Sequence, residues 1–213
     1  MLSFALYAGT TLLVVALLIA ERKSSKLGAW IAKPLASLGF VAAACVSGAM
    51  DSDYGRTVLV ALIACALGDV MLIPQGAGAA FLAGMASFAL GHAGYAFAFW
   101  QRGIDRTAAI IGLVGMAGVA VATLRWLGPR LPADMRVPIR VYMAIISAMV
   151  ALAVGASVAA SSPWMAAGAI AFAVSDLSVA RERFVQPAFV NLLWGLPLYY
   201  AAQLLLAATV RAI

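Results

Sequence analysis

Three ionisable side chains interrupt stretches of this sequence that are otherwise free of charge. Lys33, Asp69 and Asp176 are each the only charged residue in runs of 24, 45 and 40 residues, respectively. Such groups are unfavourable in an apolar setting, and they usually face a protein interior or a wet cavity. Two carboxyl groups in different surroundings can serve as an acid and a base, as in glycoside hydrolysis. The pattern therefore predicts acid–base chemistry on a substrate with a lipid tail.

Polar residues on other expected helices fall at the same depth as these three. At about 1.5 Å per helical residue, Lys33, Asp69 and Asp176 lie within roughly 6–9 Å of one membrane interface. Tyr142 and Asn191 share that level. Five residues from five helices at one level predict a polar chamber that opens toward the cytoplasm. A further group is expected closer to the middle of the bilayer: His92, Tyr199, Tyr200 and Gln203.

Each of these residues also has a purely structural interpretation. Lys33, near a helix end, can extend its ammonium group to the lipid headgroups. Either aspartate can be the ion-pair partner of that lysine, and His92 can serve helix packing. Paired intramembrane acids also relay protons, so the alternative function is a proton-coupled transporter of a small or lipid-like solute. A third possible function is that of a non-catalytic, structural membrane protein. The polar layer thins toward the outer side, which favours a one-sided enzyme pocket.

The elements that must position these side chains are membrane-spanning helices. A helix needs about 20 apolar residues to cross the hydrocarbon core, and turn residues at 74–78, 128–129 and 161–163 divide the longer apolar intervals. The first interval is interpreted as a helix rather than a signal peptide, because no basic residue precedes it. We predict an all-α polytopic membrane protein, a bundle of about eight helices forming one transmembrane domain over 1–213. The expected helices are 2–20, 27–50, 57–73, 79–100, 107–127, two within 141–180, and 184–210.

The composition of the chain excludes most other classes of protein. Hydrophobic residues make up 65% of the 213 positions and charged residues 10%, whereas soluble domains keep roughly a quarter of their residues charged. The net charge of +6 does not indicate nucleic-acid binding, because the basic residues sit in short breaks between apolar runs. One histidine and two cysteines inside apolar segments, Cys45 and Cys65, form no metal-binding pattern. We therefore expect no metal and no cofactor.

The basic residues predict the orientation of the chain in the membrane. Nine lie in or beside the odd-numbered loops and four on the other side, and cytoplasmic loops carry the excess of Lys and Arg. We expect an integral, multi-pass protein of the bacterial inner membrane with both termini outside. The nine are Arg22, Lys23, Lys26, Arg125, Arg130, Arg136, Arg140, Arg181 and Arg183, and the four are Arg56, Arg102, Arg106 and Arg211.

A series of short motifs gives the chain a family resemblance. In their order and helix placement, these motifs resemble the lysoplasmalogenase family, the YhhN-like integral membrane proteins. The resemblance covers the second to the eighth expected helix. The motifs are Lys33-Pro34, Gly68-Asp69, Gly91-His92 with Tyr95, Tyr142, Ser175-Asp176, and Tyr200 to Gln203.

This resemblance implies a reaction and a set of site residues. The reaction is hydrolysis of the vinyl-ether bond of lysoplasmalogens to a fatty aldehyde and glycerophosphocholine or glycerophosphoethanolamine. A lysophospholipid substrate and the lipid bilayer would be the partners, and no metal would be required. By motif, Asp69 and Asp176 are the expected catalytic pair, and which of them is the acid stays open. The expected substrate-binding residues are Lys33, His92, Tyr95, Tyr142, Ser175, Asn191, Tyr199, Tyr200 and Gln203.

Overall fold

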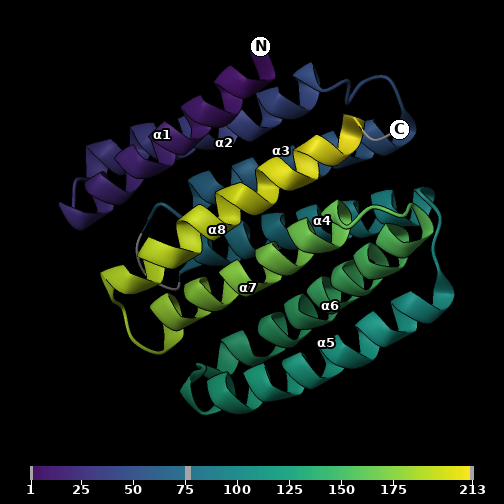
Figure 1. Ribbon diagram of the computed structural model, residues 1–213. Coiled ribbons are helices and arrows are strands. Elements are labelled where there is room, and N and C mark those ends of the chain that lie inside the picture. Colours follow the sequence, from purple (N-terminus) through teal and green to yellow (C-terminus); the bar gives the residue numbers. More distant parts are fainter. Residues whose placement is uncertain (1, 75–77, 212–213) are drawn as a thin grey trace.

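The computed structural model describes residues 2–74 and 78–211, and these residues form eight α-helices and no strand (Figure 1). Each α-helix is between 19 and 24 residues long. Short 3₁₀ turns follow α5, precede α6 and follow α8. The helices are α1 (Leu2–Arg22), α2 (Lys26–Val46), α3 (Asp53–Met71), α4 (Ala79–Gln101), α5 (Arg106–Leu127), α6 (Arg136–Ala159), α7 (Trp164–Phe184) and α8 (Phe189–Ala208).

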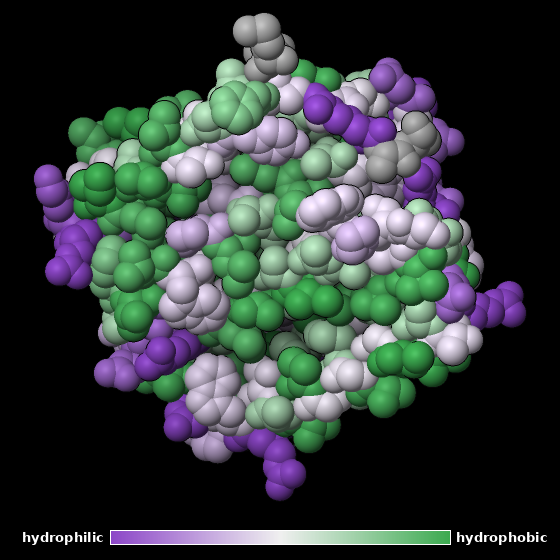
Figure 2. Space-filling model, in the orientation of Figure 1, coloured by the Kyte–Doolittle hydropathy of each residue, from purple (hydrophilic) through white to green (hydrophobic). Residues whose placement is uncertain are grey.

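Seven of the eight helices in the described chain are long and apolar enough to cross a membrane. The exception is α7, whose second half carries Asp176, Arg181, Glu182 and Arg183. Hydrophobic side chains cover the middle of the molecular surface, and hydrophilic ones gather toward the ends of the helices (Figure 2). The predicted all-α bundle of about eight helices is confirmed, and the protein is an integral, multi-pass membrane protein.

The helices form a closed ring with one helix outside it. Helices α1 to α4 pack in chain order, α4 packs on α6, and α6, α7 and α8 follow one another before α8 returns to α1 and α2 (Figure 1). Helix α5 lies outside the ring against α6 and buries only three of its residues. The interior is therefore bounded by α2, α3, α4, α6, α7 and α8.

One end of this bundle holds most of the basic residues. The last turns of α1, α3, α5 and α7 meet the first turns of α2, α4, α6 and α8 there. Nine of the 14 Lys and Arg residues lie in or beside these turns and their loops. We call this the basic end. Which side of the membrane it faces stays a prediction.

Several helix boundaries differ from the sequence expectation by four or five residues. Helix α3 begins at Asp53 rather than at 57, and α6 begins at Arg136 rather than at 141. Helix α2 ends at Val46 rather than at 50, because Gly48 adopts a positive φ of 91° in the turn that follows. Helix α7 continues to Phe184, and α8 begins at Phe189 instead of 184. The charged residues that suggested a break belong to the last turn of α7. The expected turn at 74–78 falls partly outside the described residues, which omit 75–77.

Candidate active site

Asp69 on α3 is almost fully buried, and its carboxyl group is surrounded by donors from two other helices. Ser37 Oγ and Tyr199 OH each donate a hydrogen bond to Asp69 Oδ2 at 2.7 Å. Lys33 Nζ lies 3.6 Å from Asp69 Oδ1. An ionised carboxylate only accepts hydrogen bonds, so this set of partners matches the ionised form of Asp69.

The helical spacing of α2 places two of these donors on one face. Lys33 and Ser37 are four residues apart, one turn of an α-helix, so their side chains lie beside each other. Ser37 Oγ also lies 3.0 Å from the carbonyl oxygen of Lys33. Tyr200 OH lies 3.1 Å from Ser37 Oγ and donates to the Lys33 carbonyl at 3.3 Å. Helix α8 thus supports the Asp69 site with two consecutive tyrosines.

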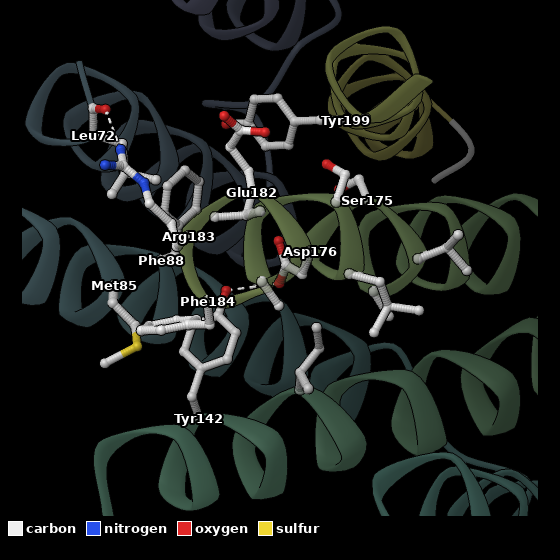
Figure 3. Close-up of a pocket in the computed structure, with 18 of the residues that line it drawn as sticks. Leu72, Met85, Phe88, Tyr142, Ser175, Asp176, Glu182, Arg183, Phe184 and Tyr199 are labelled. Atoms are coloured by element: carbon white, nitrogen blue, oxygen red, sulfur yellow. Dashed lines mark hydrogen bonds between the residues drawn. The ribbon is translucent and has the colours of Figure 1, made fainter. Parts of the chain in front are cut away.

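Asp176 on α7 has a different set of partners. Tyr142 OH of α6 donates to Asp176 Oδ2 at 2.7 Å (Figure 3). His92 Nε2 of α4 lies 3.2 Å from the same carboxyl oxygen and 2.8 Å from Tyr142 OH. Within the described part of the chain, no group bonds to Asp176 Oδ1. The Asp176 side chain is 20% exposed, against 3% for Asp69. One oxygen of Asp176 is therefore free to meet a ligand.

An aromatic side chain packs between the two carboxyl sites and takes no part in the hydrogen bonds of either. The ring of Phe172 on α7 has its centroid 5.3 Å from that of Tyr199 and 4.3 Å from that of His92. Phe88 on α4 also contacts both Phe172 and Tyr199, with centroids 6.1 and 5.8 Å apart. The two carboxyl groups consequently have separate polar surroundings within one aromatic core.

A single cavity of about 560 Å³ reaches both aspartates. Its lining at the basic end includes Glu21, Glu182 and Arg183, and its lining from α5 and α6 is apolar apart from Thr123 and Tyr142. In Figure 3, Tyr142 points from α6 toward Asp176 on α7, and Glu182 of α7 lies on the side of Tyr199 and α8. The cavity is therefore amphiphilic, with a polar mouth and an apolar limb.

Six of the residues singled out in the sequence line this cavity. His92 and Tyr200 lie behind it and bond to its lining: His92 contacts Tyr142 and Asp176, and Tyr200 donates to the carbonyl oxygen of Lys33. The six lining residues are Lys33, Asp69, Tyr142, Ser175, Asp176 and Tyr199.

Three other expected site residues are occupied elsewhere. Tyr95 OH donates to Gln203 Oε1 at 2.6 Å, so these two residues pair with each other across α4 and α8. Asn191 Nδ2 donates to Glu182 Oε2 at 2.7 Å and to the Gln186 carbonyl at 2.8 Å. Among the described residues that line the cavity, none of the three appears. Asn191 and Gln203 are selected by depth along a helix, and depth does not determine which way a side chain points. Tyr95 is selected only by the family motif.

The sequence pattern missed two polar residues of this region. Ser37 is a common helix residue in itself, but its position one turn after Lys33 is the signal that identifies it. Glu182 lies in the charged segment that we interpreted as a loop. Its carboxylate accepts hydrogen bonds from Ala188 N at 2.8 Å and from Asn191, which fixes it beside the cavity.

The arrangement is suited to proton transfer on an amphiphile. It offers a carboxyl group with a free oxygen, a second carboxyl group paired with a lysine, and an apolar limb beside them. Within the described ranges, no three His, Cys, Asp or Glu side chains are grouped so that they can hold a metal ion.

The sequence matches the YhhN family over residues 28–210. It is 34% identical over 156 residues to the bovine (Bos taurus) "Lysoplasmalogenase TMEM86A", and the aligned region covers 70% of this chain and 63% of that protein. It is 34% identical over 167 residues to the human (Homo sapiens) "Lysoplasmalogenase TMEM86B", covering 76% of this chain and 69% of that protein. A "Lysoplasmalogenase" of Mycobacterium tuberculosis is 29% identical over 160 residues, or 72% and 59% of the two chains. The chain thus spans about three fifths to two thirds of these relatives. No solved structure gives a significant match.

Proposed function

The chain belongs to the YhhN family, and from this premise we propose that it hydrolyses the vinyl-ether bond of lysoplasmalogens. The observation that carries the proposal is that Asp69 and Asp176 line one amphiphilic cavity while each has its own polar partners. The names of the curated relatives support the reaction class. The products are a fatty aldehyde and a glycerophosphocholine or glycerophosphoethanolamine.

The shape and polarity of the cavity support a lysophospholipid as the substrate. Its volume of about 560 Å³ falls in the usual range for ligand sites, roughly 300–1,000 Å³. With the headgroup at the polar mouth and the alkenyl chain along α5 and α6, the vinyl-ether bond that joins these two parts of the substrate lies between the mouth and the apolar limb. Both aspartates line the cavity.

Asp176 supplies the proton that starts the reaction. Its Oδ2 is held by Tyr142 and His92, and its Oδ1 is free to carry a proton to the substrate. Transfer of this proton to the β-carbon of the vinyl ether breaks the C=C π bond and leaves an oxocarbenium ion. Asp176 is then an anion beside that cation.

Asp69 stabilises the cation as an ionised carboxylate. Lys33 and the hydroxyl groups of Ser37 and Tyr199 hold it in that form and position. Lys33 therefore acts on Asp69 rather than on a phosphate group. Water adds to the oxocarbenium carbon and gives its surplus proton back to Asp176. The resulting hemiacetal breaks its bond to the glycerol oxygen, which takes the hydroxyl proton, and an aldehyde is released.

The test is an assay on the detergent-purified protein. The protein should convert a 1-alkenyl lysophospholipid to a fatty aldehyde, with one aldehyde released for each vinyl ether consumed. It should leave the 1-alkyl ether analogue intact. A proton-coupled transporter would need a sealed membrane to show any activity. A folded, monodisperse sample that releases no aldehyde would reject the proposal. The same protein with both Asp69→Asn and Asp176→Asn is the control.

A further inference from the structure

The apolar limb of the cavity is open on one side. Helices α6 and α7 are joined at the end away from the basic end, where Ala166 N donates to Ser157 Oγ at 2.8 Å. The half of α6 near this joint is packed, with Met149, Val150 and Ala153 buried. Toward the basic end, four α6 residues line the cavity, and two of them, Tyr142 and Met143, are partly exposed. Figure 2 shows the surface hollowed between these two helices among hydrophobic side chains.

The residues at this opening are both part of the cavity lining and exposed. Val119 on α5 and Ile170 and Val174 on α7 line the cavity, yet they are 45%, 46% and 40% exposed. Ile170 and Val174 are the seventh and eleventh of the 21 residues of α7, so they lie near the middle of the bilayer. The opening therefore faces the hydrocarbon layer and not water.

We propose that the hydrocarbon chain of the substrate passes between the cavity and the bilayer sideways, through this opening between α6 and α7. The inference rests on the proposed function, because the occupant it names is the alkenyl chain of the proposed substrate. The headgroup stays at the polar mouth, beside Glu21, Glu182 and Arg183. Each methylene group transferred from lipid to water is unfavourable. A side opening keeps the chain in apolar surroundings from the bilayer to the aspartates.

The opening also determines how the site responds to chain length. A closed limb would limit the number of carbons that fit. An opening into the bilayer lets the far end of a long chain remain among the lipids. We expect alkenyl chains of very different length to be cleaved at similar rates once they are present at the same membrane concentration.

The experiment narrows the opening with tryptophan. The variants are Val119→Trp and Ile170→Trp, alone and combined, and their exposed positions allow a larger side chain without disturbing the core. The matched control is Val114→Trp, also on α5 and 68% exposed, which does not line the cavity. Each variant is assayed with a long-chain lysoplasmalogen in lipid vesicles and with a short-chain, water-soluble alkenyl analogue.

We expect the combined variant to lower kcat/KM for the long-chain substrate by about tenfold or more and to leave the short-chain reaction nearly unchanged. The control should change neither. Unchanged long-chain turnover, or an equal loss for both substrates, would overturn the inference. If the wild-type protein cleaves neither substrate, the proposed function fails instead.

A second measurement tests the opening without hydrolysis. A 1-alkyl lysophospholipid with a diazirine halfway along its chain is photo-crosslinked to the protein in vesicles, and the labelled peptides are identified by mass spectrometry. Labelling concentrated at Val119, Ile146, Ile170 and Val174, and reduced in the combined variant, supports the inference. Labelling spread over exposed positions such as Val114, with no excess at the opening, contradicts it.

Discussion

Replacing either aspartate by asparagine keeps the size of the side chain and removes its acidic group, so that it can neither give up a proton nor carry a negative charge. We expect Asp69→Asn and Asp176→Asn each to lower the rate of aldehyde release by about 10²–10⁴. The folded yield of Asp176→Asn should stay largely intact, because an asparagine oxygen can still accept the hydrogen bond from Tyr142. Asp69→Asn keeps the acceptor for Tyr199 but leaves the Lys33 ammonium without its counter-charge, so this variant should also melt at a lower temperature. Aldehyde release and the elution profile in detergent measure the two effects.

The control for these variants is Asp134→Asn, since Asp134 is an exposed carboxylate at the basic end. It should retain wild-type turnover. Near-normal activity of either intramembrane variant would mean that its aspartate is structural, and the paired mechanism would have to be abandoned.

Lys33 and Asp69 form a mostly buried ion pair whose two members can be tested together. Their side chains are 12% and 3% exposed. Removing one partner of such a pair leaves an uncompensated charge and typically costs about 3–5 kcal/mol of stability. We therefore expect Lys33→Met to lower the melting temperature clearly, and the Lys33→Met/Asp69→Asn double variant to recover part of that loss without regaining activity.

A thermal-shift measurement in detergent decides this prediction. If Lys33→Met melts at the wild-type temperature, the ammonium group spends its time at the lipid headgroups and does not hold Asp69. If the double variant is no more stable than Lys33→Met, the two side chains are not coupled.

Among the elements, α7 and α8 pack especially closely where both carry a small residue. A methyl group added at Gly195 on α8 would overlap Ser178 Oγ on α7. Gly195→Ala should destabilise the protein by about 1–3 kcal/mol, as overpacking does. It should also lower activity, because Tyr199 lies one turn from Gly195 and holds Asp69. Melting temperature and aldehyde release are the two readouts.

A compensating change makes this prediction sharper. Ser178→Gly removes the overlapping atoms, so Gly195→Ala/Ser178→Gly should melt higher than Gly195→Ala and recover activity. A double variant that is worse than either single variant would show that close packing is not the reason for the small residues here.

The helices also show how far sequence reasoning could go. Depth counts along apolar runs correctly bring Asp69, Asp176 and Tyr142 to one cavity, because helical rise converts residue number into depth. The same counts select Gln203, which accepts a hydrogen bond from Tyr95 instead of lining the cavity. Depth fixes one coordinate of a side chain, and its direction around the helix axis depends on packing between helices, which one sequence does not reveal.

The end of α7 is a second feature that the sequence alone does not predict. A run of charges marks the end of an apolar segment, but the helix itself continues through Glu182 to Phe184. The contact between Glu182 and Asn191 was for this reason not foreseen. Backbone hydrogen bonding can extend a helix into the interface after its side chains have become polar.

For the whole molecule, the distribution of basic residues predicts that the basic end faces the cytoplasm. In a background with Cys45→Ala and Cys65→Ala, a single cysteine is introduced either by Gln186→Cys at the basic end or by Asp51→Cys at the opposite end. Both positions are exposed. A membrane-impermeant maleimide applied to intact cells should label the Asp51→Cys protein and leave the Gln186→Cys protein unlabelled until the cells are permeabilised. The reverse pattern would invert the topology.

The cavities at the two ends of the bundle are separate. At the end opposite the basic end, a smaller cavity of about 350 Å³ is lined by polar residues of the α2–α3 loop and by the region after α8. It shares no lining residue with the larger cavity in the described chain. A transporter that alternates between two states also has a cavity open to one side in each state. The assay in detergent and in sealed membranes, and not this separation, therefore distinguishes a transporter from an enzyme.

The side opening between α6 and α7 sets the quantity on which the reaction rate should depend. A site that takes its chain from the hydrocarbon layer samples the mole fraction of substrate among the lipids, not its amount per volume of solution. Diluting the substrate with inert phospholipid at constant total concentration should therefore slow turnover, while diluting the whole suspension with buffer should leave the rate per enzyme molecule unchanged. The aldehyde, released into the same layer, would inhibit in proportion to its share of the membrane.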